Sequence, residues 1–217
     1  MNTTRRQLLT SLGSSALIAA TAGCLGSGNS SPPTPAADIS PVNSLPQPTR
    51  GGEDASITVD IFSDFACPHC KDFHETVEPT LVNDYVDDGI ITLRHFDFPI
   101  PVDQEQSWPA AMAARAVQDA DSMNAFWTFR SNLFKNRSDL STDLYIGLAE
   151  GTSVAEKAIR AGAEKAKYQP VVQKDKTTGQ DRGVEGTPTA FVDGEKTVPS
   201  GDQSYTDVIV SAIESKR

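Results

Sequence analysis

The sequence predicts one α/β domain, in which a helical insertion separates an N-terminal strand–helix–strand unit from a C-terminal β-hairpin and helix. Two β-branched runs at residues 57–62 and 90–96, with helical periodicity between them, predict the N-terminal unit. Helical periodicity without a strand-like run fills about residues 106–170, and two short strands flanking a turn follow at residues 184–198. Once a predicted export segment is set aside, a chain of 217 residues has room for one such domain.

Residues 1–23 are typical of an export signal. Arg5 and Arg6 form a twin arginine, and the apolar run that follows is too short and too rich in Ser, Thr and Gly for a membrane-spanning helix. The run ends in Thr-Ala-Gly-Cys, which resembles the lipobox of secreted lipoproteins, except that Thr21 stands where Leu is usual. We therefore expect an extracytoplasmic protein, lipid-anchored through Cys24 to the outer face of the cytoplasmic membrane. The alternative is that Cys24 is an incidental small residue.

The next segment, residues 24–52, is predicted to be a tether. It is rich in Gly, Ser, Asn and Thr, and six prolines interrupt regular secondary structure. The signal and the tether together resemble those of the secreted lipoproteins of halophilic archaea. The folded domain is therefore expected at residues 53–217.

The net charge of the chain excludes one class of partner. The formal net charge is -10, and removal of Arg5 and Arg6 with the export signal leaves 17 basic against 29 acidic residues, or -12. So acidic a surface repels nucleic acid and anionic lipid head groups. We therefore expect no nucleic-acid partner, and contact with the membrane through the lipid anchor only.

The first predicted helix starts at Cys67 and connects the two β-branched runs. Apolar residues recur three and four positions apart from Phe73 to Tyr85, which is the period of a helix. Pro79 predicts a kink in this helix, and Gly89 its end. With its flanking strands, the helix makes a βαβ crossover between parallel strands.

The C-terminal part of the chain predicts a hairpin and a last helix. Strand character returns at residues 184–192, and Asp193-Gly194 is a typical hairpin turn. Residues 195–198 are the expected partner strand. Residues 205–215 have the periodicity of a closing amphipathic helix.

Cys67 and Cys70 are the candidate catalytic residues. They enclose Pro68 and His69 in a Cys-Pro-His-Cys motif at the start of the predicted helix, where unpaired N–H groups and the helix dipole favour a thiolate. Cys67 is therefore the expected attacking sulfur and Cys70, one turn on, the resolving one. Pro68 suits the first helical turn, and His69 is expected to add a donor or a positive charge beside the thiolate. A lone pair of this spacing could also be a structural disulfide or half a metal site.

The chain resembles the DsbA-like family of thiol-disulfide oxidoreductases. Its matching stretches include residues 62–65 leading into the cysteine motif, 97–100, 108–116, 126–127 and 186–194. The resemblance implies a thioredoxin fold with a helical insertion and no cofactor. It also implies a cis bond between Thr187 and Pro188, beside the cysteines, where an incoming peptide docks. The expected partners are thiols or disulfides of exported polypeptides and a membrane redox protein that resets the cysteine pair.

The sequence departs from the family pattern at one position. Many relatives carry a buried Glu six residues before the first cysteine, where this chain has Ile61. Either Asp60 substitutes through a shifted strand, or proton transfer uses water or His69. His95 has no evident partner and is expected at a strand end or on the surface.

The motif leaves several functions open. The leading interpretation is an oxidase of exported proteins, because this tetrapeptide is associated with the oxidising members of the family. The first alternative is a reductase of extracellular thiols or of cytochrome maturation, and the second a metal-binding thiol chaperone. Cys67, Cys70 and His74 could hold a soft metal ion, but a histidine on a helix face is the preferred interpretation and no metal site is predicted. A solute-binding lipoprotein is disfavoured by the short chain.

Overall fold

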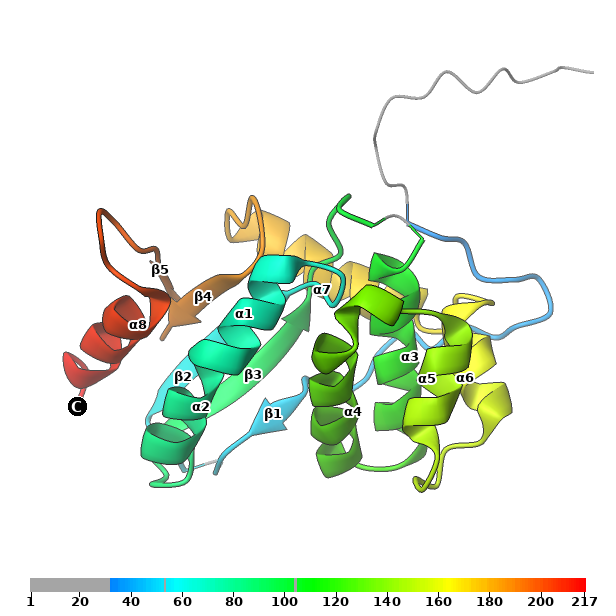
Figure 1. The fold of residues 1–217 in the computed structure, drawn as a ribbon, viewed down its shortest axis with the longest axis horizontal. Helices are drawn as coiled ribbons and strands as arrows, with labels where there is room; N and C mark the ends of the chain where they lie inside the picture. Colours follow the sequence, from blue (N-terminus) through cyan, green and yellow to red (C-terminus); the bar gives the residue numbers. More distant parts are fainter. Residues whose placement is uncertain (1–31, 53, 104) are drawn as a thin grey trace, which may run out of the picture.

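The computed structural model describes residues 32–52, 54–103 and 105–217. The predicted export signal and Cys24 lie outside this part of the chain. The described residues confirm the predicted α/β class and thioredoxin fold, with helices on both faces of a mixed five-stranded sheet (Figure 1). Among the described residues, no helix has the length and apolar character needed to cross a membrane.

The sheet has the strand order β1-β3-β2-β4-β5. Its strands are β1 (Thr49–Arg50), β2 (Ile57–Ser63), β3 (Ile91–Asp97), β4 (Thr189–Val192) and β5 (Glu195–Thr197). Strand β2 is parallel to β3 and antiparallel to β4, so the N-terminal unit and the C-terminal hairpin join at β2. Both faces of β2 are buried, although Thr58 and Asp60 alternate with its apolar residues.

The crossover between β2 and β3 is a broken helix rather than the predicted kinked one. Helix α1 (Pro68–Thr76) is followed by the short α2 (Glu78–Leu81) and a π-helical turn, η1 (Val82–Val86). Pro79 lies in the first turn of α2, because a proline has no N–H to donate and its ring clashes inside a helix. The chain leaves the helix through Gly89, whose φ of 71° suits glycine.

The helical insertion contains α3 (Ser107–Ala120), α4 (Met123–Lys135), a 3-10 turn η2 (Arg137–Asp139), α5 (Thr142–Ala149) and α6 (Glu156–Ala163). These helices gather beside the sheet (Figure 1). A further helix, α7 (Gln169–Asp181), runs past the predicted end of the insertion and packs on β3. The last helix, α8 (Tyr205–Glu214), packs on β4 and β5.

Two apolar clusters cover the two faces of the sheet. One lies between the sheet and helices α1, α2 and α8, and includes Ile61, Phe73 and Ile209. The other contains Phe62 and Phe98, which approach α7 so closely that a Cβ at Gly179 would lie 2.6 Å from the Phe98 ring. Gly179 therefore lets α7 lie directly on the aromatic face of the sheet.

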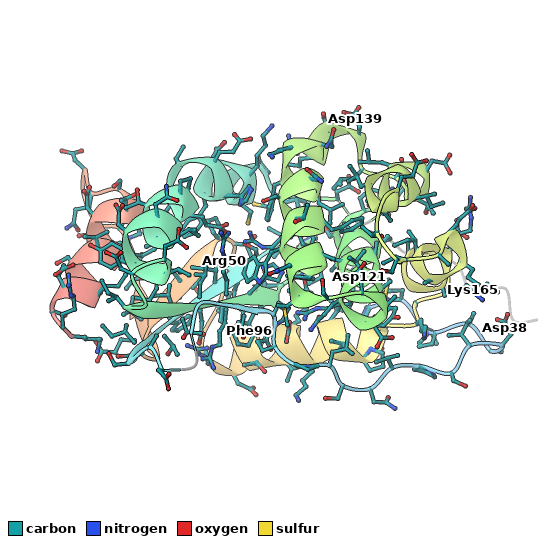
Figure 2. The ribbon with its side chains drawn as sticks, turned by 90° about the horizontal axis from the view of Figure 1, so that it is seen from below. Asp38, Arg50, Phe96, Asp121, Asp139 and Lys165 are labelled. Atoms are coloured by element: carbon teal, nitrogen blue, oxygen red, sulfur yellow. The ribbon has the colours of Figure 1, made fainter. Side chains whose placement is uncertain are left out.

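The predicted tether differs from the structure in residues 32–50. The Ala36 N–H donates to the Lys165 carbonyl at 3.0 Å, and the Trp127 indole donates to the Thr49 carbonyl at 3.0 Å. Asp38 and Lys165 form an ion pair of 2.8 Å at the end of the domain (Figure 2). The prolines thus keep this segment extended along the domain rather than free of it, and the domain begins before residue 53.

Candidate active site

Cys67 lies where the loop after β2 enters helix α1. It is the N-cap residue of the helix, in an extended conformation, with Pro68 in the first turn, as the sequence predicts. Sγ of Cys67 lies 3.4 Å from the Thr187 carbonyl oxygen, to which the protonated thiol donates. Cys70 lies one turn along the helix and is fully buried, whereas Cys67 is 2% exposed.

Short-range hydrogen bonds lower the pKa of Cys67 to about 5. The largest contribution is the hydrogen bond from the Cys70 thiol, followed by the Thr187 side chain and the backbone N–H groups of Cys70 and His69, while burial opposes them. The Thr187 hydroxyl is buried and has no hydrogen-bond partner within the part of the chain that the structure describes. It is therefore available to the thiolate.

The pKa of Cys70 shifts in the opposite direction. Burial, and then the hydrogen bond to Cys67 and the charge on that sulfur, raise the pKa of Cys70 well above that of an ordinary thiol. The Asp64 N–H points at its sulfur, with an N–Sγ distance of 3.5 Å. At neutral pH the reduced pair therefore consists of a Cys67 thiolate and a Cys70 thiol.

The imidazole of His69, which the sequence suggested as a donor or a positive charge beside the thiolate, is not among the main groups that lower the pKa of Cys67. Its side chain is 79% exposed, and Nδ1 lies 3.9 Å from an oxygen of Asp72, itself a surface residue. The contribution of His69 to the low pKa of Cys67 comes from its backbone N–H. The helix N-terminus, rather than the ring, stabilises the thiolate.

The Thr187–Pro188 peptide bond is cis and lies beside Cys67, which confirms the expected arrangement of this loop. A groove of about 450 Å³ borders the loop, between α1 and the start of α8. Tyr205 lies in this groove and donates its hydroxyl to the Pro188 carbonyl at 2.8 Å. The sequence placed Tyr205 only at the start of a helix, and its contact with a loop seventeen residues earlier could not be predicted.

Asp60 does not replace the missing acid of the family. It lies on the strand face opposite Ile61, where its carboxylate bonds Arg94 at 2.6 Å and Arg182 at 2.7 Å. Ile61 itself belongs to the apolar cluster under α1. The hypothesis that a shifted strand brings Asp60 to the position of the missing acid is therefore wrong, because Ile61 occupies that position.

The buried acid nearest the cysteines is Asp64, which the sequence analysis did not single out. Its carboxylate accepts from the N–H groups of Ala66 at 2.8 Å and Ile100 at 2.7 Å. Burial, with a smaller contribution from the charge on Cys67, raises the pKa of Asp64 to about 6 against the effect of these bonds. Its position three residues before Cys67, in the loop that ends at the cysteine, was the available signal.

His95 lies near the end of β3 and is fully buried, so the predicted surface position is wrong. Its ring bonds the Asp97 carboxylate at 2.9 Å and accepts from Arg130 at 3.1 Å. Arg130 makes two further bonds, of 2.5 and 2.8 Å, to Glu78. Burial lowers the pKa of His95 to about 4, so the ring is neutral and joins two buried ion pairs.

His74 belongs to the same buried network rather than to a thiol cluster. Its Nδ1 lies 2.7 Å from Glu78, and its other nitrogen bonds the Ser131 hydroxyl at 3.1 Å. Glu78 accepts from Arg130 as well, so the network ties α1 and α2 to α4. In the described residues, no group of three His, Cys, Asp or Glu side chains is arranged to hold a metal ion.

Comparison with known proteins gives a consistent picture. A family profile described as thioredoxin matches residues 43–212, which include both cysteines and the Thr187–Pro188 bond. Disulfide bond formation protein D of Bacillus subtilis is 28% identical over 152 residues, covering 67% of this chain and 67% of that protein. The probable disulfide bond formation protein D of Bacillus cereus is 30% identical over 168 residues, covering 72% and 74%. The solved structure of oxidised BdbD from Bacillus subtilis has a TM-score of 0.71 and 27% identity, covering 82% of this chain and 97% of that chain.

Proposed function

The chain belongs to the thioredoxin family and is a thiol-disulfide oxidoreductase, and we propose that it oxidises the thiols of exported proteins outside the cytoplasm through Cys67 and Cys70. The observation that carries this proposal is that the pKa values of the two thiols shift in opposite directions. A low pKa at Cys67 stabilises the reduced pair and so makes the disulfide a stronger oxidant. The names of the Bacillus relatives, disulfide bond formation proteins, favour the same direction.

The proposed reaction begins with a disulfide between Cys67 and Cys70. A substrate thiolate attacks Sγ of Cys67 and forms a mixed disulfide, and the Cys70 sulfur leaves and takes up a proton. The Asp64 N–H, which points at Cys70, favours this departure. A second substrate thiolate then attacks the substrate sulfur of the mixed disulfide and expels Cys67 as a thiolate. The substrate loses two electrons and two protons, and the pair gains the electrons.

The low pKa of Cys67 makes it the better leaving group in the second step. Its thiolate is stable at neutral pH, so its departure needs no proton donor. The reduced pair then requires an electron acceptor, and we assign this role to a membrane redox protein that re-forms the disulfide. During exchange, the backbone at Thr187 is placed to pair with the substrate, because its carbonyl already lies 3.4 Å from the Cys67 sulfur.

The location is part of the proposal. Residues 1–23 would direct export, and a lipid on Cys24 would hold the domain at the outer face of the membrane. Intact-mass analysis of protein extracted from membranes tests this. A mature chain that begins at a lipidated Cys24 supports it, and an unmodified Cys24 inside a longer chain contradicts it.

The decisive experiment compares two single variants in cells. Cys70→Ser cannot form the internal disulfide, but its Cys67 thiolate can attack a disulfide of an exported protein and expel one substrate thiolate; without the Cys70 thiol to release the adduct, mixed disulfides should accumulate on non-reducing gels. Cys67→Ser should accumulate none, and it is the matched control. Equal amounts of adduct in both variants would refute the assignment of Cys67 as the attacking sulfur.

The reductase alternative is decided by the reduction potential. An oxidase of this kind requires a potential well above that of thioredoxin, which is about -270 mV. A wild-type value near the thioredoxin value would replace the proposed oxidase by a reductase. The roles of Cys67 and Cys70 in exchange would be unchanged.

A further inference from the structure

We propose that Tyr205 is a positioning residue for substrate docking, which holds the Thr187–Pro188 loop against the cysteine helix. The inference rests on the proposed function and assigns one side chain to one part of it, the recognition of a peptide rather than of a small thiol. The phenol is the only side chain that hydrogen-bonds the Pro188 carbonyl among the described residues.

Tyr205 contacts both parts of the active site. Its hydroxyl donates to the Pro188 carbonyl at 2.8 Å, and its ring packs edge-on against Phe73 of α1, with a centroid distance of 5.3 Å and an interplanar angle of 77°. Phe73 lies one turn beyond Cys70 and is buried. One side chain therefore joins the docking loop to the helix that carries both cysteines.

The start of α8 fixes Tyr205 in this place. Ser204 and Asp207 form a reciprocal capping box, in which the Ser204 hydroxyl accepts from the Asp207 N–H and the Asp207 carboxylate accepts from the Ser204 N–H. Tyr205 is the first residue of the helix, and α8 packs on the strands of the hairpin that follows the loop. The phenol is thus placed by rigid elements rather than by a flexible segment.

The hydrogen bond also determines which backbone groups remain for a substrate. The Pro188 carbonyl is occupied by Tyr205, and Pro188 has no N–H, so a peptide in the groove meets the backbone of Thr187 instead. Burial raises the pKa of Tyr205 above its usual value of 10, so the hydroxyl is protonated and can donate at neutral pH.

The test compares a peptide with a small dithiol, because dithiothreitol reaches the Cys67 sulfur without docking along the loop. Tyr205→Phe keeps the ring on Phe73 and removes only the hydroxyl. We expect kcat/KM for oxidation of an unfolded peptide dithiol to fall by about fivefold, mainly through KM, as for loss of one neutral hydrogen bond. The rate with dithiothreitol should be unchanged, which also shows that the variant folds and keeps its active site.

Tyr168→Phe is the matched control. Its hydroxyl also makes a 2.8 Å hydrogen bond, to Asp119, but in the helical insertion. This variant should oxidise both substrates like the wild type. An equal loss on peptide and dithiothreitol in Tyr205→Phe, or no loss on either, overturns the positioning role. If the wild type itself oxidises no peptide, the proposed function fails, and the inference fails with it.

Discussion

The reduction potential of the Cys67–Cys70 pair should change its dependence on pH near pH 5. Above this value the reduced pair carries a Cys67 thiolate and a protonated Cys70, so oxidation releases one proton with two electrons. The potential should then fall by about 30 mV per pH unit. Below it both sulfurs are protonated, two protons are released, and the slope should double to about 60 mV per pH unit.

The size of the thiolate effect follows from the same shift. The pKa of Cys67 is depressed from 9.0 to about 5, so the stabilisation of the reduced state is complete above pH 9 and absent below pH 5. At pH 7, two pH units above the lowered pKa, half of this stabilisation is present, and it favours the reduced pair by about 3 kcal/mol. This corresponds to a potential about 60 mV higher than that of a pair with ordinary thiols.

The assay is equilibration with glutathione buffers from about pH 4 to pH 8, followed by alkylation and quantification of the free thiols. Cys70→Ala is the companion variant. Because the Cys70 thiol makes the largest contribution to the low pKa of Cys67, thiolate absorbance should show a higher Cys67 pKa in this variant. A single slope of about 60 mV per pH unit through neutral pH would refute the reasoning, since Cys67 would then be protonated there.

Three further perturbations test the surroundings of the pair. Arg130→Ala removes the guanidinium from the buried Glu78 carboxylate, leaving it His74 alone, and should lower the free energy of unfolding by about 3 kcal/mol in chemical denaturation. Arg160→Ala, which breaks surface pairs, should change the free energy of unfolding little. Asp64→Asn removes a carboxylate whose pKa is raised to about 6, so in the wild type the cost of ionising it in the folded state grows as pH rises from about 4 to 6. Over that interval the free energy of unfolding of the variant should rise by up to about 3 kcal/mol relative to the wild type. A difference that does not depend on pH would contradict this. His69→Ala keeps the backbone N–H and should raise the Cys67 pKa less than Cys70→Ala does, as measured by thiolate absorbance.

The sequence predicts most of the fold because its strands and its hairpin depend on local patterns. The run at residues 57–62 becomes β2, and Asp193-Gly194 forms the expected turn between β4 and β5. Strand β4 nevertheless begins only at Thr189. The predicted strand was too long because the cis loop at Pro188 precedes β4, and the available signals were Gly186 and Pro188, which disfavour the interior of a strand.

Helix α7 and the N-terminal segment were missed for a different reason. Gly179 weakens the helical pattern, and its role becomes clear only when the rings of Phe62 and Phe98 are placed against it. Residues 32–50 are rich in proline, which indicates an extended chain but not what it packs on. In both cases a contact between distant parts of the chain decides the structure, and no local period records it.

The functional site divides in the same way. Cys67 and Cys70 were predictable, because a helix N-terminus and a two-residue spacing are properties of one short segment. The groups around the pair come from elsewhere in the chain: the Thr187 side chain, which helps to lower the pKa of Cys67, and the Tyr205 phenol, which bonds the docking loop. Likewise, no pattern in the sequence indicated that His95 would be buried between Asp97 and Arg130.

The way in which Cys67 is stabilised bears on how the pair can work on an acidic surface. No cationic side chain is among the main contributions to its low pKa, which come from the Cys70 thiol, the Thr187 side chain and two backbone N–H groups. Such contacts act at short range in a buried site, so dissolved salt screens them much less than it would screen an exposed imidazolium at His69. The many surface carboxylates, by contrast, act on Cys67 only across solvent and are screened. The thiolate can therefore keep its low pKa whether the salt concentration is low or high, because the helix and the cis loop supply its stabilisation.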